Sequence, residues 1–302
     1  MMNATFLYSN KTKVSYGSLE NIRILYLSMI LPPFCLYLPS VIVILCVFFT
    51  TSRIRENVRY LLFSHMIISD SLQLSLAFFL FIAVLYHVFL PVKWCCLIAG
   101  VSASTTLITP YNLALMSLER YIAVCFPLRH GVICTVRRCN VAILVMWGIG
   151  ALPIVIELLI LSFLVDNPFF SRKTFCIWRL LQVYNFQITI RFLTFSLSFT
   201  VVVIIIGYTY IKVIMVARKM GSGTSSASKA AKTVLLHGFQ LLLCLCSFSS
   251  TFTENLFKKT YKNMAVINFF VFMCLPQYIS PFIYGVRDEI IRARIRKLIC
   301  ST

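Results

Sequence analysis

Long runs without charged residues dominate the chain, and short polar or basic segments separate them. Seven runs contain at most one charged residue each, and they cover residues 24–52, 60–92, 94–118, 139–165, 180–211, 233–253 and 263–286. As an α-helix, which rises 1.5 Å per residue, each run is long enough to cross about 30 Å of hydrocarbon. Because backbone groups in lipid need internal hydrogen-bond partners, and the runs do not alternate as β-barrel strands do, we predict helices.

The composition supports a membrane-embedded chain. Of 302 residues, 60% are hydrophobic and 12% are charged, whereas a soluble domain has about 25% charged residues. The pattern therefore predicts an all-α membrane protein, a seven-transmembrane helix bundle in a lipid bilayer. We expect three parts: an extracellular N-terminus (1–23), the transmembrane domain (24–286), and a cytoplasmic amphipathic helix and tail (287–302).

A net charge of +19 is also found in proteins that bind nucleic acid. In such proteins the basic residues gather on one polar face. Here they form short clusters between apolar runs, which is typical of helix ends beside anionic lipid, so we expect no nucleic-acid partner. Charged residues interrupt the first 23 residues, so we predict no cleavable signal peptide and expect the first span to direct insertion.

Two signals predict that the N-terminus is extracellular and the C-terminus cytoplasmic in a multi-pass plasma-membrane protein. The glycosylation motif N-x-[ST] occurs at Asn3 and Asn10, both before the first span. With this orientation, the inner segments hold 17 of the 28 Lys and Arg residues and the outer segments hold 10, as the positive-inside rule requires. A chance occurrence of the motifs in a polar tail is the alternative.

The last segment predicts a short amphipathic eighth helix. Ile291, Ile295, Leu298 and Ile299 share one helical face, and basic residues occupy the others. Such a helix lies along the inner leaflet. Cys300 at its end is either a palmitoylation site or an unmodified thiol.

Four features together resemble the rhodopsin-like (class A) G-protein-coupled receptors. They are the string LERYIAVCFPLRH at 118–130, the string SPFIYGVRD at 280–288, the mid-span Asp70, and the pair Cys95 and Cys176 at outer helix ends. The resemblance covers nearly the whole chain. It implies a receptor that changes shape when a ligand binds and activates a heterotrimeric G protein on the cytoplasmic side.

The third-span string resembles the odorant-receptor version of the family motif. The segments TVLLHGFQLLLC at 233–244 and ICTVRR at 133–138 are most similar to a fish-type odorant-receptor subfamily. The resemblance thus implies a small odorant as ligand, bound in the outer half of the bundle.

The family places a switch at the inner end of the third helix. The resemblance implies that Glu119 holds Arg120, next to Tyr121, in the inactive state, and that Tyr208 and Tyr284 swing toward this arginine on activation. The alternative is an interfacial charge pair whose side chains reach the lipid headgroups.

Asp70 lies in the middle of an apolar run, where a charge costs roughly 2.5–3.5 kcal/mol. The family has a sodium ion at this aspartate, and Thr109 and Ser280 would be its polar neighbours here. A protonated or hydrogen-bonded Asp70 is the alternative. Ser280 stands where the family usually has Asn before proline, which weakens this expectation.

Cys95 and Cys176 both face an oxidising compartment in this orientation, so a disulfide between the third helix and the second outer loop is expected. Cys96 is adjacent and competes with Cys95. The family pattern favours Cys95.

Glu157 and Arg191 are lone charges in the outer halves of the fourth and fifth spans. Charges inside membranes usually face the bundle interior and often pair. We expect one of two arrangements. Either Glu157 and Arg191 form an ion pair, or Arg191 binds an anionic odorant.

The ligand pocket is only weakly indicated. The family's pocket lies among helices three, five, six and seven, and ordinary helix packing is the alternative at each position. Besides Arg191, the candidate residues are Ser102, Ala103, Thr106, Leu107, Phe248, Phe252 and Met273.

Other classes of function make different demands on the sequence. A rhodopsin-like receptor for a peptide, a lipid or another small molecule is the main alternative. A transporter would show inverted repeats, and an enzyme a metal-binding or nucleophile motif; the sequence has neither. We expect no enzyme activity and no cofactor apart from the sodium ion.

Overall fold

The computed structural model describes residues 2–176, 184–219, 235, 238–239, 242, 269–275, 277–278 and 293. In this part, five helices are long and apolar enough to cross a membrane. They belong to α1 (Met2–Thr50), α3 (Val58–Leu85), α4 (Val92–Cys125), α6 (Val136–Leu164) and α9 (Asn185–Lys219). They coincide with the first five predicted runs. Most of the sixth and seventh predicted spans and most of the predicted eighth helix lie outside the described residues.

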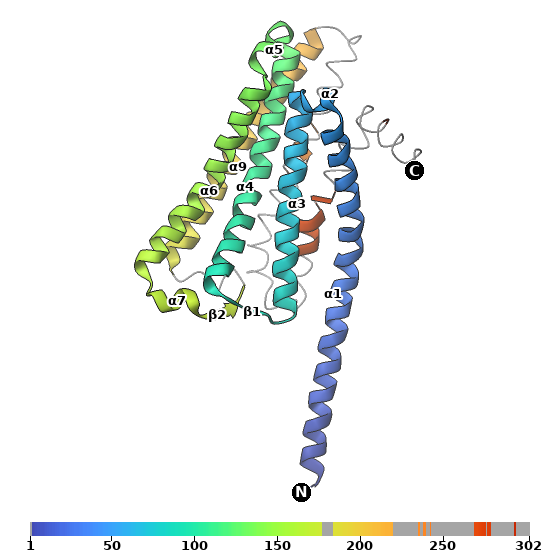
Figure 1. Ribbon diagram of the computed structural model, residues 1–302, viewed down its shortest axis with the longest axis vertical. Coiled ribbons are helices and arrows are strands. Elements are labelled where there is room, and N and C mark those ends of the chain that lie inside the picture. The colour runs from blue at the N-terminus through green and yellow to red at the C-terminus, as the bar shows by residue number, and fades with distance from the viewer. Residues whose placement is uncertain are drawn as a thin grey trace.

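The long helices run side by side in alternating directions (Figure 1). The N-terminus of α1 and the short elements β1, β2 and α7 lie at one end, and α2 and α5 lie at the other. We call these the outer and inner ends. Short elements connect the helices, and their bounds are α2 (Ser52–Arg55), β1 (Phe89–Pro91), η1 (Pro127–Arg129), α5 (His130–Ile133), α7 (Asn167–Ser171) and β2 (Lys173–Phe175).

Local sequence explains where the helices begin. The Asn57 side chain accepts a hydrogen bond from the backbone N–H of Arg59 at 3.0 Å and caps α3. Thr135 caps α6 in the same way through the N–H of Arg138 at 3.4 Å. Pro91 precedes the first residue of α4 and closes the short strand β1. These capping groups lie at the polar boundaries between the apolar runs.

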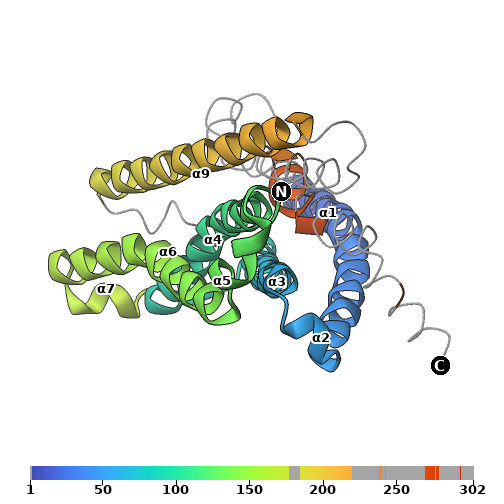
Figure 2. The same ribbon diagram turned by 90° about the horizontal axis from the view of Figure 1, so that it is seen from above.

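α4 is the central helix. It packs against α3, α6 and α9, and in the view from above it lies between them (Figure 2). More than half of its apolar stretch is buried. α6 is the opposite case: Leu144 is 70% exposed and Phe163 is 86% exposed. Because the exposed residues are large and apolar, this side of α6 is suited to lipid contact.

The core occupies the middle of the bundle. Its fully buried side chains include Met66 and Ile67 from α3, Leu113 from α4, and Val202 from α9. Cys274 joins them from η2 (Phe269–Cys274), a π-helical segment. The seventh predicted span therefore contributes to the same core as the first five.

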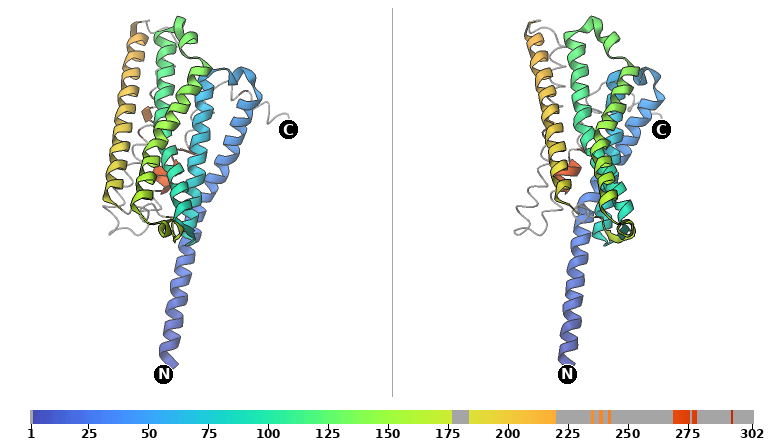
Figure 3. Two further views of the ribbon diagram at one scale, coloured as in Figure 1. Left: turned by 60° about the vertical axis from the view of Figure 1, so that its left-hand side comes forward. Right: turned by 90° about the vertical axis from the view of Figure 1, so that its left-hand side faces the viewer.

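α1 begins earlier than the first apolar run. Its helix runs from Met2, and the stretch suited to cross a membrane starts at Arg23. The preceding part projects beyond the other helices at the outer end (Figure 3). Pro32, Pro33 and Pro39 lie inside the helix, as transmembrane helices tolerate.

Candidate functional site

Glu119 and Arg120 lie at the inner end of α4. The Nε atom of Arg120 is 3.0 Å from Oε2 of Glu119, and both side chains are largely shielded, with 17% and 7% of their area exposed. The charge-assisted contact is therefore stronger than an exposed surface pair. The two residues are in contact as the sequence predicted.

A second basic group contacts the same carboxylate. Nε2 of His130, the first residue of α5, is 3.2 Å from Oε1 of Glu119. His130 is the last residue of the string at 118–130, from which the sequence predicts no role for it. It comes eleven residues after Glu119 and beyond a proline, so no helical spacing connects the two.

The tyrosines predicted for the switch are partly described. Tyr121 and Tyr208 contact each other edge to face, with ring centroids 5.8 Å apart, and so connect α4 to α9. Lys212 Nζ lies 5.6 Å from the Tyr208 ring. Tyr284 lies outside the described residues.

Asp70 is buried in the middle of α3, and its Oδ1 atom accepts a hydrogen bond from the Thr109 hydroxyl of α4 at 2.7 Å. Tyr37 of α1 is hydrogen-bonded to Ser71, the next residue, at 3.0 Å. Three helices thus meet at one polar point inside the apolar core. Ser280 lies outside the described residues.

The lone charges of α6 and α9 form an ion pair. Nη2 of Arg191 donates to both Glu157 oxygens, at 2.8 and 2.6 Å. Nε2 of Gln187 donates to Oε1 of Glu157 at 2.9 Å. The Oε1 atom of Gln187 accepts from the backbone N–H of Tyr184 at 3.0 Å, which caps the start of α9. The predicted pairing is therefore observed, and Gln187 adds a contact that was not predicted.

The pocket candidates of α4 differ in burial. Ser102 and Leu107 are buried, whereas Ala103 and Thr106 are half-buried and share one side of the helix. The Thr106 hydroxyl accepts from Nε2 of Gln73 in α3 at 2.9 Å. Phe248, Phe252 and the side chain of Met273 lie outside the described part of the chain, so the structure does not bring the complete predicted pocket together.

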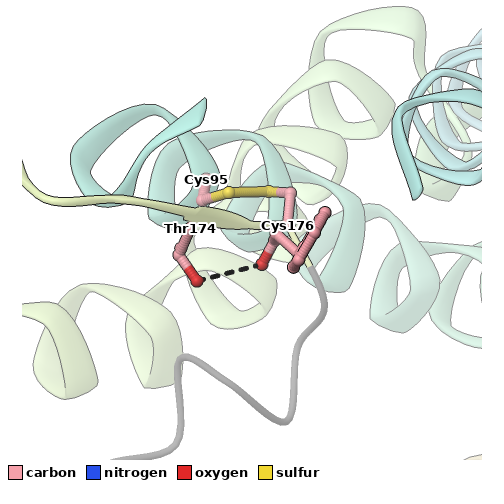
Figure 4. The surroundings of a disulfide bond; sticks show 4 residues. Cys95, Thr174 and Cys176 are labelled. Atoms are coloured by element: carbon pink, nitrogen blue, oxygen red, sulfur yellow. Dashed lines mark hydrogen bonds between the residues drawn. A yellow bond between two sulfur atoms is a disulfide. The ribbon is translucent and has the colours of Figure 1, made fainter. Parts of the chain in front are cut away.

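The disulfide at the outer end joins Cys95 of α4 to Cys176, with Cα atoms 5.3 Å apart. Cys96 is a buried free thiol, so the choice of Cys95 is confirmed. β1 and β2 pair antiparallel beside the bridge, with Phe89 opposite Phe175. Figure 4 shows the bridge tying this loop to α4.

The predicted modification sites are the glycosylation motifs at Asn3 and Asn10 and the palmitoylation candidate Cys300. Asn3 and Asn10 fall in the projecting part of α1, at the same end of the molecule as the disulfide. Cys300 lies outside the described residues.

Gln187 and His130 contact predicted site residues but were not predicted from the sequence, for different reasons. Gln187 lies four residues before Arg191, so both share a face of α9, and a polar residue in an apolar run was a usable signal. His130 offered no such signal, because its contact depends on how the chain turns after α4.

Comparison with known proteins places the chain among receptors. Residues 40–284 match the family model described as 7 transmembrane receptor (rhodopsin family). Odorant receptor 131-2 of Danio rerio is 30% identical over 241 residues, which are 78% of this chain and 74% of that receptor. Olfactory receptor 4K1 of Homo sapiens is 28% identical over 62% of this chain and 60% of that receptor. Growth hormone secretagogue receptor type 1 of Rattus norvegicus is 43% identical over only 56 residues.

Proposed function

Since the chain belongs to the rhodopsin family of seven-transmembrane receptors, we propose that it is an odorant receptor that activates a heterotrimeric G protein. Membership of this family also confirms that the chain is not an enzyme. The similarity to Odorant receptor 131-2 over most of both chains supports an odorant as ligand. The observation that carries the signalling function is the shielded Glu119–Arg120 pair at the inner end of α4.

The pair acts as a switch in this proposal. The Glu119 carboxylate holds the Arg120 guanidinium inside the bundle when no ligand is bound. An odorant that binds better to the active conformation shifts the equilibrium toward it. Arg120 then leaves Glu119 and contacts the G protein, and the Tyr121–Tyr208 contact between α4 and α9 rearranges.

The inner end faces the cytoplasm in this proposal, and the outer end faces the extracellular side of the plasma membrane. The disulfide at the outer end supports this orientation, because such bonds persist in oxidising compartments. Arg53, Arg55 and Arg138 lie at the opposite end, as the positive-inside rule requires.

The ligand is a small neutral odorant in this proposal. Ala103 and Thr106 on the half-buried side of α4 contribute to its site. Glu157 neutralises Arg191, so an odorant carboxylate would have to displace Glu157 before it could bind the arginine. The alternative is a receptor for a peptide, a lipid or another small molecule, and the match to a secretagogue receptor that would support it covers 56 residues.

A sodium ion at Asp70 is a further part of the proposal. A carboxylate and a hydroxyl 2.7 Å apart in a buried position provide the hard oxygen ligands that such cations prefer. Asp70 and Thr109 would hold the ion, which would supply a positive charge beside the carboxylate. Replacing NaCl with choline chloride should lower the thermal stability of the wild type but not of Asp70→Asn. An equal response of both proteins would contradict the site.

The function is tested by expressing the receptor with a promiscuous G protein and screening water-soluble odorants by calcium imaging. We expect Arg120→Ala to lower the maximal response to any active odorant at least about tenfold, the size of typical couplings between receptor sites, with unchanged surface expression. Arg172→Ala, which removes an exposed arginine at the outer end, is the matched control. An undiminished response of Arg120→Ala would contradict the switch.

A further inference from the structure

Glu119 is shared between two basic groups, one on each carboxylate oxygen. Arg120 Nε lies 3.0 Å from Oε2, and His130 Nε2 lies 3.2 Å from Oε1. The carboxylate is 7% exposed and the imidazole 33% exposed. The histidine therefore lies where solvent protons reach it, while the carboxylate that it contacts is shielded.

The chain holds His130 in this place through its turn after α4. α4 ends at Cys125, Pro127 begins η1, and His130 begins α5. Nη1 of Arg138, in the first turn of α6, donates to the Val132 carbonyl at 2.9 Å. α5 therefore contacts α6 through the Arg138 hydrogen bond and contacts α4 through His130.

Histidine is the type of side chain that commonly acts as a switch at physiological pH, and His130 is a histidine in contact with Glu119. Arg120 of α4, Arg129 of η1 and Arg138 of α6 are further basic residues of the elements around it. The Cys139 thiol of α6 also lies near. Burial, and then the negative charge of Glu119, raise the pKa of the Cys134 thiol after α5, so this thiol stays neutral.

Protonation of His130 changes how strongly Glu119 holds Arg120. A neutral imidazole contributes a hydrogen bond only. An imidazolium adds a positive charge that neutralises the carboxylate and repels the nearby guanidinium. Because these groups are partly shielded from water, the interaction is stronger than between fully exposed charges.

We propose that His130 is a pH-sensitive positioning residue of the receptor switch, which loosens the hold of Glu119 on Arg120 when the cytoplasm becomes acidic. This inference rests on the proposed function, because it requires that release of Arg120 activates the G protein. The response of the receptor then depends on cytoplasmic pH as well as on the odorant.

The test uses the purified full-length receptor in nanodiscs with a purified heterotrimeric G protein and no odorant. Nucleotide exchange is measured between pH 6.0 and 8.0 and is divided by the exchange with empty nanodiscs at each pH. We expect basal stimulation by the wild type to rise about threefold to tenfold as pH falls, a typical size for one partly shielded charge interaction.

His130→Gln keeps a hydrogen-bond donor toward Glu119 but takes up no proton in this range, so its profile should be flat. His130→Tyr serves the same purpose if the first variant folds poorly. His87→Gln, at the outer end of the bundle, is the matched control and should keep the wild-type slope.

The outcomes separate the two proposals. A slope that persists in both His130 variants, or stimulation by the wild type that falls with acidity, would overturn the role of His130 alone. Stimulation that is absent at every pH and equal to that of Arg120→Ala would contradict the proposed function, and the inference would fail with it.

Discussion

Charged residues inside the helices mark the places where single side chains decide how helices meet. Glu157 accepts hydrogen bonds from Arg191 and Gln187, and Gln187 also caps α9. The Tyr184 hydroxyl donates to the Leu164 carbonyl at the end of α6, at 3.2 Å. The outer ends of α6 and α9 are therefore joined by connected polar contacts, and Glu157 is their centre.

Removing one member of this ion pair should cost more than removing both. Glu157→Gln leaves the Arg191 guanidinium in a shielded place without its carboxylate, and we expect a loss of about 3 kcal/mol in unfolding free energy. The double variant Glu157→Gln/Arg191→Gln should recover part of that loss. Size-exclusion chromatography of the heated receptor measures the stability of both variants. If the effects of the two substitutions on stability were additive, that would contradict the pairing.

The intramembrane charges can be predicted from the sequence, but not all of their partners can. An ionised residue in an apolar run is costly, which is why Asp70, Glu157 and Arg191 stood out. A neutral polar residue in an apolar run does not carry this cost and therefore stands out less in the sequence. The bond from Trp147 Nε1 to His65 Nε2, 2.9 Å long between α6 and α3, was therefore not predicted.

The approach of α4 and α6 depends on glycine at two positions. A Cβ atom at Gly100 would lie 3.0 Å from Ile154, and one at Gly150 would lie 3.3 Å from Ile108 and from the Ser104 carbonyl oxygen. Small residues let transmembrane helices approach closely, and van der Waals packing then stabilises the contact. The central position of α4 depends on this close packing.

Gly150→Leu should push α4 and α6 apart and lower the unfolding free energy by about 1–3 kcal/mol, as overpacking does. Gly148→Leu is the matched control, because it makes the same change in the same helix where no atom lies within 4 Å of the added Cβ. The thermal midpoints of both variants in detergent measure the difference. Equal midpoints would show that close packing is not needed here.

The apolar runs predicted the helices of the described part well and their ends less well. A stretch without charges indicates only the part of a helix that lies in lipid. The helix itself continues beyond that part as long as its backbone hydrogen bonds are satisfied. For this reason α4 extends past the predicted limit at residue 118 to Cys125, and α9 extends to Lys219. Glu119 lies in this unpredicted extension of α4, and the turn that brings His130 to it follows directly after Cys125.

At the scale of the whole molecule, the Cys95–Cys176 bridge joins segments 81 residues apart in the chain. Closing so long a loop restricts the unfolded chain and stabilises the receptor by about 3 kcal/mol or more. Cys95→Ser and Cys176→Ser should each lower cell-surface expression strongly, as antibody labelling of intact cells would measure. Cys96→Ser is the matched control and should be expressed normally. Normal expression of Cys95→Ser together with low expression of Cys96→Ser and Cys176→Ser would assign the bridge to Cys96.

The orientation of the molecule gives a prediction that needs no ligand. Asn10 precedes the start of the membrane-crossing stretch at Arg23 by 13 residues, or about 20 Å along a helix. Both acceptor asparagines are therefore clear of the membrane if the outer end is extracellular. Each of Asn3→Gln and Asn10→Gln should remove one glycan, seen as a stepwise increase in electrophoretic mobility, and the double variant should be insensitive to glycosidase.

Asn21→Gln controls for the substitution itself, because Asn21 is followed by Ile-Arg and lies in no acceptor motif. Its mobility should equal that of the wild type. A wild-type receptor without glycans, whose N-terminal tag is reached by antibody only after cells are permeabilised, would reverse the orientation. It would also place the Glu119–Arg120–His130 cluster outside the cell, where it could not meet a G protein. The glycosylation test therefore precedes every experiment on the switch.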